Sequence, residues 1–406
     1  MKVYHIQVTM MSSGNAPYRI HKAMLESGID SNILTYESGK RFYHVKILKF
    51  SILHQIVEWT TFFFNRLRYH GKRPNTYVYS ALPLVGDKRW EKEVRDADVI
   101  YIHWIGGKTL SIKNIENIAK LGKPIIFFLH DTFTFTGGCH HFFDCEEYKT
   151  GCKNCPMFVH NDIAASQALK KKNLFNKYKN IHFAGPSHWI ANCAEKSFVL
   201  EGHHVSAIYN YIDERQFKKL DKRIARDFLN LPQDKFIISF GAKTSTKNPV
   251  KGWPYLKEAL DKTNFNDVVL LILGNDYNPE VEKEVKYPCY FTGQMRDETS
   301  LALWNNASDL YISPTLAESF GMTYIENALC GVPVIGFNCT AVPEVVNSST
   351  GLLAKYKDVD DLARCIIEIH DKGFTPTLRD NYNSDGILQQ HIQLMNKLVS
   401  ENKSNT

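Results

Sequence analysis

Long apolar runs are missing from this sequence of 406 residues. No stretch reaches the about 18 consecutive apolar residues that a membrane-spanning helix needs. The first residues are too short and too polar for a secretory signal peptide, and they begin a strand pattern at once. We therefore expect a cytoplasmic protein without a spanning helix, and we leave open a peripheral contact with the inner face of the membrane.

A strong charge of either sign is also absent. The net charge of +6 is mild for this length, and charged residues make up an ordinary 23%. Nucleic-acid binding usually needs a concentrated basic face, so we expect no nucleic-acid partner. A mild positive balance suits phosphorylated ligands or an anionic membrane surface.

Nine cysteines are present, and without a secretory signal they indicate reduced thiols or metal ligands rather than disulfides. Four of them lie in one irregular loop with the spacing C-x5-C-x6-C-x2-C: Cys139, Cys145, Cys152 and Cys155. Four thiolates so close together suit a tetrahedral structural zinc, and His140 or His141 could replace one of them. The alternative is four free cysteines in a packed loop.

The chain is too long for one ordinary core and predicts two domains. Short apolar runs alternate with helix-length segments, which is typical of parallel α/β units. We place a first domain at residues 1–207 and a second at 208–386, with a C-terminal helix at 387–399 joined to the first. The expected strands are Lys2–Val8, Asn32–Thr35, Val99–His103, Pro124–Leu129, His182–Gly185, Lys235–Phe240, Val268–Leu273, Tyr290–Thr292, Leu310–Ser313 and Val334–Phe337.

Chemistry-bearing residues of the second domain follow the strand Leu310–Ser313. Glu318 falls in the loop after this strand, where a carboxylate can accept hydrogen bonds from sugar hydroxyls. Gly321 and Met322 start a helix, and the backbone N–H groups there suit a phosphate. Taken alone, Glu318 could simply cap this helix, and Glu326 could be a solvated helix residue. Lys251, after the strand Lys235–Phe240, could neutralise a leaving diphosphate or be merely an exposed lysine.

In the first domain two histidines follow neighbouring expected strands. His103 and His130 should emerge at the carboxyl ends of these strands, where doubly wound folds place ligands. A strand-end histidine can also be purely structural. Asp131 could orient an imidazole or cap the next turn. Gly14 lies in a small-residue loop before a helix and could approach phosphate, although the full Gly-x-Gly-x-x-Gly pattern is absent.

The run from Pro314 to Ile335 resembles the donor-site motif of family 4 retaining glycosyltransferases almost residue for residue. The segment from His130 to Pro156 resembles bacterial polysaccharide glycosyltransferases of the colanic-acid-biosynthesis type. The resemblance implies the GT-B fold, with two facing Rossmann-like domains and the active site in the cleft between them. It also implies that Glu318 and His130 contact the transferred sugar and that Glu326 contacts the nucleotide ribose.

Two positions depart from the family pattern. Relatives carry a basic residue directly after the strand that precedes Lys251, but this chain has Gly241-Ala242-Lys243, so Lys243 or Lys247 would have to serve as its partner. The segment from Thr340 to Glu344 stands where relatives often carry a glycine-rich turn. No acidic metal-binding motif of other sugar transferases is evident, and we expect catalysis without a cofactor.

The stretch 54–73 mixes aromatic residues with basic residues at its end. It could be an interfacial helix beside an anionic membrane, or a core-packed helix with a basic end. Together these patterns predict transfer of a hexosyl unit from a nucleoside diphosphate sugar to a saccharide or lipid-linked saccharide, in surface polysaccharide biosynthesis. The alternatives are an epimerase or hydrolase of the same fold, or a partner that binds nucleotide sugars without turnover.

Overall fold

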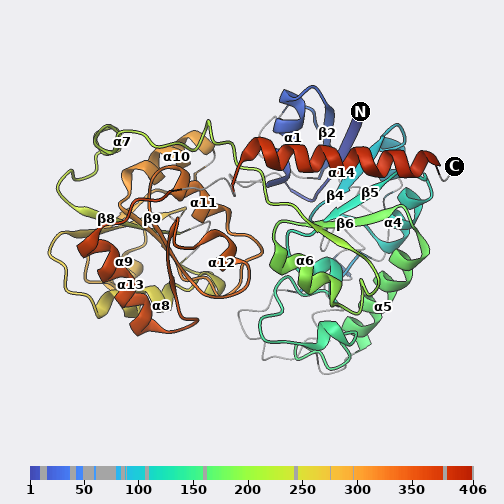
Figure 1. Ribbon diagram of the computed structural model, residues 1–406. Helices are drawn as coiled ribbons and strands as arrows, with labels where there is room; N and C mark the ends of the chain where they lie inside the picture. The colour runs from blue at the N-terminus through green and yellow to red at the C-terminus, as the bar shows by residue number, and fades with distance from the viewer. Residues whose placement is uncertain are drawn as a thin grey trace. The chain divides into compact units, whose positions relative to one another are not determined.

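A computed structural model describes residues 1–9, 16–36, 43–48, 59–60, 79–83, 87, 89–105, 109–158, 162–241, 246–274, 276–295, 297–377 and 382–404. The chain forms two compact units (Figure 1). The first runs to Tyr211 and takes up the C-terminal segment from Asp385, whereas the second spans Ile212–Ser384. The sequence placed this division at 207/208.

The first unit is built on a parallel sheet of seven strands in the order β3-β2-β1-β4-β5-β6-β7. The order runs outward in both directions from β1 and β4, so the switch point of this doubly wound sheet lies between them. The central strands β4 and β5 are buried along their whole length, as expected for a sheet covered on both faces. The strands are β1 Lys2–Ile6, β2 Asp30–Thr35, β3 Val45–Ile47, β4 Val99–Ile102, β5 Ile125–Phe128, β6 Ile181–Gly185 and β7 Val205–Ala207.

The helices of the first unit include one that comes from the far end of the chain. Helix α14, drawn in red, lies along β4 and β5 in Figure 1, and its His391 accepts or donates a 3.1 Å hydrogen bond at the Tyr101 hydroxyl of β4. Asn402 near its end donates to the carbonyl of Gly122 at 2.9 Å. The helices are α1 Ala16–Glu26, α3 Arg89–Glu93, α4 Ile112–Ala119, α5 Asp162–Lys177, α6 His188–Glu195 and α14 Ser384–Ser404, with short 3-10 turns η1 Phe133–Phe135 and η2 Glu147–Lys149.

The second unit repeats the plan with a parallel six-stranded sheet in the order β10-β9-β8-β11-β12-β13. Its switch point lies between β8 and β11. Every residue of β9 is buried. Its uninterrupted apolar run, Val-Val-Leu-Leu-Ile-Leu, is typical of a strand that helices cover on both faces. The strands are β8 Phe236–Gly241, β9 Val268–Leu273, β10 Cys289–Phe291, β11 Leu310–Ser313, β12 Val334–Phe337 and β13 Gly351–Ala354.

Helices cover both faces of this second sheet. In Figure 1, α8, α9 and α13 lie on one side of it and α10 and α11 on the other. Helix α7 carries Arg226, whose guanidinium pairs with Asp309 at 2.5 Å. The helices are α7 Lys222–Phe228, α8 Trp253–Asp261, α9 Pro279–Lys283, α10 Glu298–Ala307, α11 Met322–Leu329, α12 Val342–Val345 and α13 Val359–Lys372, with the 3-10 turn η3 Pro249–Lys251.

The predicted fold class, two doubly wound parallel α/β domains, is confirmed. All ten expected strands are present within one or two residues of their predicted bounds. Three further strands were missed: β3, β7 and β13 contain only three or four residues each, too few to show a period. Within the described residues, no helix has the length and apolar content needed to cross a bilayer.

Candidate functional site

The loops that follow β8 and β11 are held together by backbone contacts. The carbonyl of Val250, in the turn η3, accepts hydrogen bonds from the Leu316 N–H at 2.8 Å and from the Thr315 hydroxyl at 3.1 Å. Gly252 ends this turn with φ +76°, and a Cβ added there would lie 1.9 Å from the carbonyl oxygen of Pro314. The two loops therefore approach so closely that only glycine fits at position 252.

This contact places Lys251 beside Glu318. The Lys251 Nζ lies 3.1 Å from the Glu318 Oε2, and their side chains are 25% and 21% exposed. The carboxylate raises the pKa of Lys251, because it stabilises the charged ammonium more than burial disfavours it. The sequence proposed both residues independently, and the structure brings them together at the carboxyl edge of the second sheet.

Thr340 supports Glu318, a role that the sequence does not predict. Its hydroxyl accepts a 3.0 Å hydrogen bond from the backbone N–H of Glu318. Thr340 has φ +49°, a left-handed conformation that favours glycine. Thr340 lies in the segment where relatives often carry a glycine-rich turn. The absence of glycine there is the only feature of the sequence that points to this position. The backbone keeps the glycine-like conformation, and the threonine adds a side-chain contact.

Gly321 is the N-cap residue of α11, at the predicted helix start, and has φ +93°. A Cβ at this position would lie 2.7 Å from the Tyr324 ring and 3.3 Å from Val345. The Tyr324 hydroxyl in turn donates to the carbonyl of Ser313 at the end of β11. Gly321 itself has no side chain to cap this helix start, and a helix N-terminus favours anions through its N–H groups and its dipole.

Other predicted donor-site residues have different outcomes. Met322 is the first residue of α11, next to Gly321. Glu326 lies on the same helix and is only 1% exposed. The alternative interpretation, that Glu326 is merely a solvated helix residue, is therefore wrong. Lys247 is exposed. Gly14 and Lys243 lie outside the described residues, and so does nearly all of the stretch 54–73, so their assignments stay predictions.

In the first unit, His130 follows β5 and His103 follows β4. The His130 Nε2 lies 2.8 Å from the His103 Nδ1, and the His103 Nε2 lies 2.9 Å from the Nδ1 of His5 in β1. Burial lowers the pKa of His130 to about 4, so the imidazole is neutral near pH 7. His5 was not singled out from the sequence, because a polar residue inside a short apolar strand carries no signal of its partner.

Asp131 does not orient His130. Its Oδ1 accepts from the Phe133 N–H at 2.8 Å and so caps the turn η1, which was one of the two predicted roles. Its Oδ2 lies 2.6 Å from the Nδ1 of His140, whose Nε2 is 2.8 Å from the Ser80 hydroxyl. His140 is thereby engaged away from the cysteines.

The four predicted metal ligands line one small cavity of about 10 Å³. The thiols of Cys139 and Cys155 influence each other, which lowers the pKa of Cys155 to about 7 and raises that of Cys139. The Cys152 Sγ accepts from the Gly137 N–H at 3.2 Å. As the described side chains are placed, no three His, Cys, Asp or Glu residues are arranged to hold a metal ion. The structural zinc stays a prediction.

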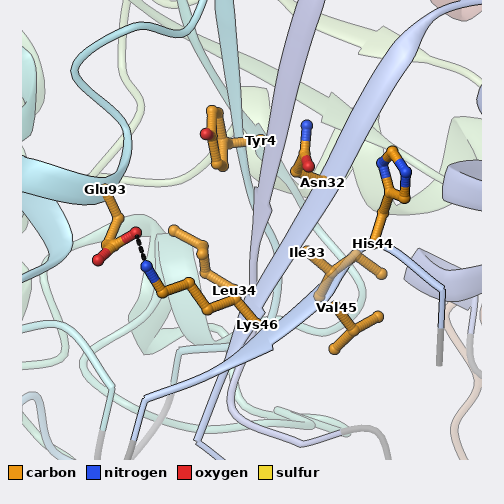
Figure 2. A pocket seen from close by; sticks show the side chains of 8 residues that line it. All are labelled: Tyr4, Asn32, Ile33, Leu34, His44, Val45, Lys46 and Glu93. Carbon is orange, nitrogen blue, oxygen red and sulfur yellow. Dashed lines mark hydrogen bonds and ion pairs between the residues drawn. The ribbon is translucent and has the colours of Figure 1, made fainter. Parts of the chain in front are cut away.

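Figure 2 shows a separate open pocket of about 390 Å³ against β1, β2 and β3. The Lys46 ammonium pairs with the Glu93 carboxylate at 2.6 Å beside it, so these two charges compensate each other. None of the residues proposed from the sequence lines this pocket. The lining residues are Tyr4, Asn32, Ile33, Leu34, His44, Val45, Lys46 and Glu93.

The chain has two parallel-sheet α/β domains, and solved structures of similar fold identify this architecture as the GT-B fold. The sucrose-phosphate synthase from Thermosynechococcus elongatus matches with a TM-score of 0.67 and 16% identity, covering 99% of this chain and 100% of that one. The Anabaena protein Alr3699/HepE, solved in complex with UDP and glucose, matches with a TM-score of 0.62 and 18% identity over 100% of both chains.

Residues 235–372, within the second unit, match the family model described as "Glycosyl transferases group 1". An uncharacterized 41.2 kDa protein in the cps region of Klebsiella pneumoniae is 26% identical over 41% of this chain and 45% of its own length. A protein of Escherichia coli K12 named as a colanic acid biosynthesis glycosyl transferase, WcaC, is 23% identical over 74% of this chain and 75% of its own. The chain thus matches less than half of the first relative and three quarters of the second. The family resemblance expected from the motifs is confirmed.

Proposed function

We propose that the protein is a retaining glycosyltransferase that moves a hexosyl unit from a nucleoside diphosphate sugar to a saccharide or lipid-linked saccharide acceptor. The observation that carries the proposal is the pair of Lys251 and Glu318, 3.1 Å apart next to the start of α11. Both residues lie within the segment that matches the glycosyl transferase family. The two groups have complementary uses for such a donor, one for phosphate and one for hydroxyl groups.

Lys251 serves the diphosphate. When the bond between the anomeric carbon and the diphosphate oxygen breaks, negative charge grows on the leaving group, and a fixed ammonium stabilises it. The raised pKa of Lys251 keeps this ammonium charged at neutral pH. The first N–H groups of α11, at Gly321 and Met322, supply further donors along a favourable helix dipole.

Glu318 serves the transferred sugar by accepting hydrogen bonds from its hydroxyl groups. We assign His130 to the same sugar and Glu326 to the nucleotide ribose, as the family resemblance implies. In the proposed step the acceptor oxygen attacks the anomeric carbon from the face that the diphosphate leaves. The acceptor's proton passes to the leaving diphosphate, so the step needs no metal or other cofactor and retains the anomeric configuration.

The named relatives support a role in surface polysaccharide synthesis. The solved Alr3699/HepE complex contains UDP and glucose, and the E. coli relative is named for colanic acid biosynthesis. A lipid-linked acceptor would bring the protein to the inner face of the cytoplasmic membrane, and we propose peripheral contact there. This part of the proposal rests on the relatives and on the mild net charge of +6.

The decisive experiment incubates the purified protein with a panel of nucleoside diphosphate sugars, with and without saccharide acceptors. Mass spectrometry should find a glycosylated acceptor and a free nucleoside diphosphate, and NMR should show a retained anomeric configuration. Sugar release without acceptor would favour a hydrolase, an isomerised donor an epimerase, and binding without turnover a silent partner. Each of these outcomes would overturn the proposal.

The site itself is tested by the variants Glu318→Ala and Glu318→Gln. Loss of a hydroxyl acceptor at the reacting sugar should lower kcat on the order of 100-fold, as for other groups that act in the transition state. Glu284, which pairs with Lys257 at 3.9 Å in the same unit, provides the control. The Glu284→Gln variant should keep its activity, and a Glu318→Ala enzyme as active as this control would refute the assignment.

A further inference from the structure

The three hydrogen-bonded histidines of the first unit form a continuous line across adjacent strands. His5 lies in β1, His103 directly after β4 and His130 shortly after β5, and these strands are neighbours in the sheet. The ring nitrogens are 2.9 Å apart between His5 and His103 and 2.8 Å apart between His103 and His130. His5 is 0% and His103 3% exposed, whereas His130 is only half-buried. We call these three residues the histidine relay.

The relay is neutral. Burial lowers the pKa of His5 and of His103 well below the ordinary value of 6.5, and the neighbouring imidazoles lower it further. Among the described residues, the other titratable groups facing the relay are His21 and His391, which disfavour a positive charge, Asp131, which favours one at His130, and Tyr101, whose ring stacks on His5 and His103. Burial dominates, so each ring carries a single ring proton at neutral pH.

Three neutral imidazoles in series allow only two proton arrangements, because each ring has one donor and one acceptor. In the inward arrangement His130 donates to His103, His103 donates to His5, and the Nε2–H of His5 points into the core. That Nε2 is buried and has no hydrogen-bond partner among the described residues. A buried N–H without an acceptor is the rarer and costlier kind of orphan, so the inward arrangement is disfavoured.

The outward arrangement leaves only a lone pair of His5 without a partner. His5 then donates from Nδ1 to His103, and His103 donates from Nδ1 to the Nε2 of His130. The proton of His130 is left on Nδ1, the ring nitrogen outside the relay. We propose that His5 and His103 are positioning residues that fix His130 as a neutral Nδ1–H donor, aimed at an oxygen of the sugar substrate.

The sugar substrate in this inference rests on the proposed function, whereas the tautomer of His130 follows from the hydrogen bonds alone. A fixed N–H donor can hold a sugar hydroxyl or ether oxygen without taking or giving up a proton. His130 would therefore act by orientation and hydrogen bonding, not as a general acid or base. The pH profile of the activity should then show no inflection near pH 6.5 that arises from titration of His130.

The direct test is a long-range ¹H–¹⁵N correlation spectrum of the histidine-labelled full-length protein at pH 7, with the His130 signal assigned by its loss in His130→Gln. The spectrum should show His130 neutral and protonated on Nδ1. A proton on Nε2, or on both nitrogens, would overturn the inference whether or not the protein transfers sugar.

The functional arm compares three variants by kcat/KM for the sugar donor. His103→Leu removes the donor to His130 and should lower kcat/KM on the order of 10-fold, the worth of about one hydrogen bond. His103→Asn keeps an amide near the Nδ1 position and should recover most of that loss. His21→Asn, also fully buried but bonded to Ser31 and Tyr43 instead, controls for general destabilisation. If His103→Leu matches the His21→Asn control, the relay does not position His130, although the transferase proposal would stand.

Discussion

The variant Gly252→Ala tests whether the packing between two loops sets the position of Lys251. Its backbone has φ +76°, and a Cβ there would lie 1.9 Å from the carbonyl oxygen of Pro314. Real Cβ contacts stay above 3.0 Å, so the two loops would have to separate by about 1 Å. No side chain can relieve this overlap by rotating, because the atom that is met belongs to the backbone.

Two effects of Gly252→Ala should be separable. The left-handed backbone costs an alanine about 1–2 kcal/mol of folding free energy. The displacement of the loop moves Lys251 relative to Glu318, and a misplacement of about 1 Å can lower catalytic efficiency on the order of 100-fold. We therefore expect both a lower melting temperature and a loss of kcat/KM near that size.

The matched control is Gly202→Ala, because Gly202 has φ +81° and no atom within 4 Å of an added Cβ. This control should show the backbone cost alone, with kcat/KM unchanged within a factor of about three. The assays are thermal denaturation and donor-dependent transfer at the same protein concentration. A Gly252→Ala protein as active as Gly202→Ala would refute the claim that the contact with Pro314 sets the site.

Three further predictions concern the rest of the molecule. Burial lowers the pKa of His391 from 6.5 to about 3. As the pH falls, His391 therefore takes up a proton in the unfolded chain before it does so in the folded protein. The first unit should lose about 2 kcal/mol from this residue between pH 7 and pH 5, and a melting temperature that does not fall over this range would contradict it. Protein purified without chelator should contain about one zinc per chain by elemental analysis, and Cys155→Ser should lower that content; a metal-free wild type would disprove the zinc site. Arg226→Met should lower the unfolding free energy by about 1–3 kcal/mol in denaturant titration. The substitution removes the guanidinium donor from the carbonyls of Ala307 and Lys235 and from Asp309, which keeps its pair with Lys222; an effect under about 0.5 kcal/mol would show that the Arg226 contacts are weak.

The sheets were predictable because a buried parallel strand reads as an uninterrupted apolar run. Val268–Leu273 matches β9 at both ends for this reason. The missed strands have no such run: β3 and β7 have three residues each, and β13 begins with glycine. These short segments are strands because they pair with neighbouring strands that are distant in sequence, so the local sequence does not predict them.

The site was predictable in its residue types but not in its contacts. Lys251 and Glu318 were proposed from separate motifs, and only the fold shows that their atoms lie 3.1 Å apart. Gly252 packs against the Pro314 carbonyl, and the Glu318 N–H donates to the Thr340 hydroxyl. The two residues of each pair are distant in sequence, so no local pattern predicts these contacts. The role of Asp131 was left open between two local uses, and hydrogen-bond geometry decided for the turn cap.

The central claim is that Lys251 binds the diphosphate of a nucleotide donor. Isothermal titration of a panel of nucleoside diphosphates into the wild type, Lys251→Met and Lys262→Met measures this directly. Lys262 is a suitable control, because it also pairs with a carboxylate in the same unit, that of Asp360. We predict that one nucleoside diphosphate binds the wild type and the Lys262→Met control alike, and binds Lys251→Met at least about 10-fold more weakly, as the loss of a charge-assisted contact requires. Equal dissociation constants for all three proteins would contradict the account.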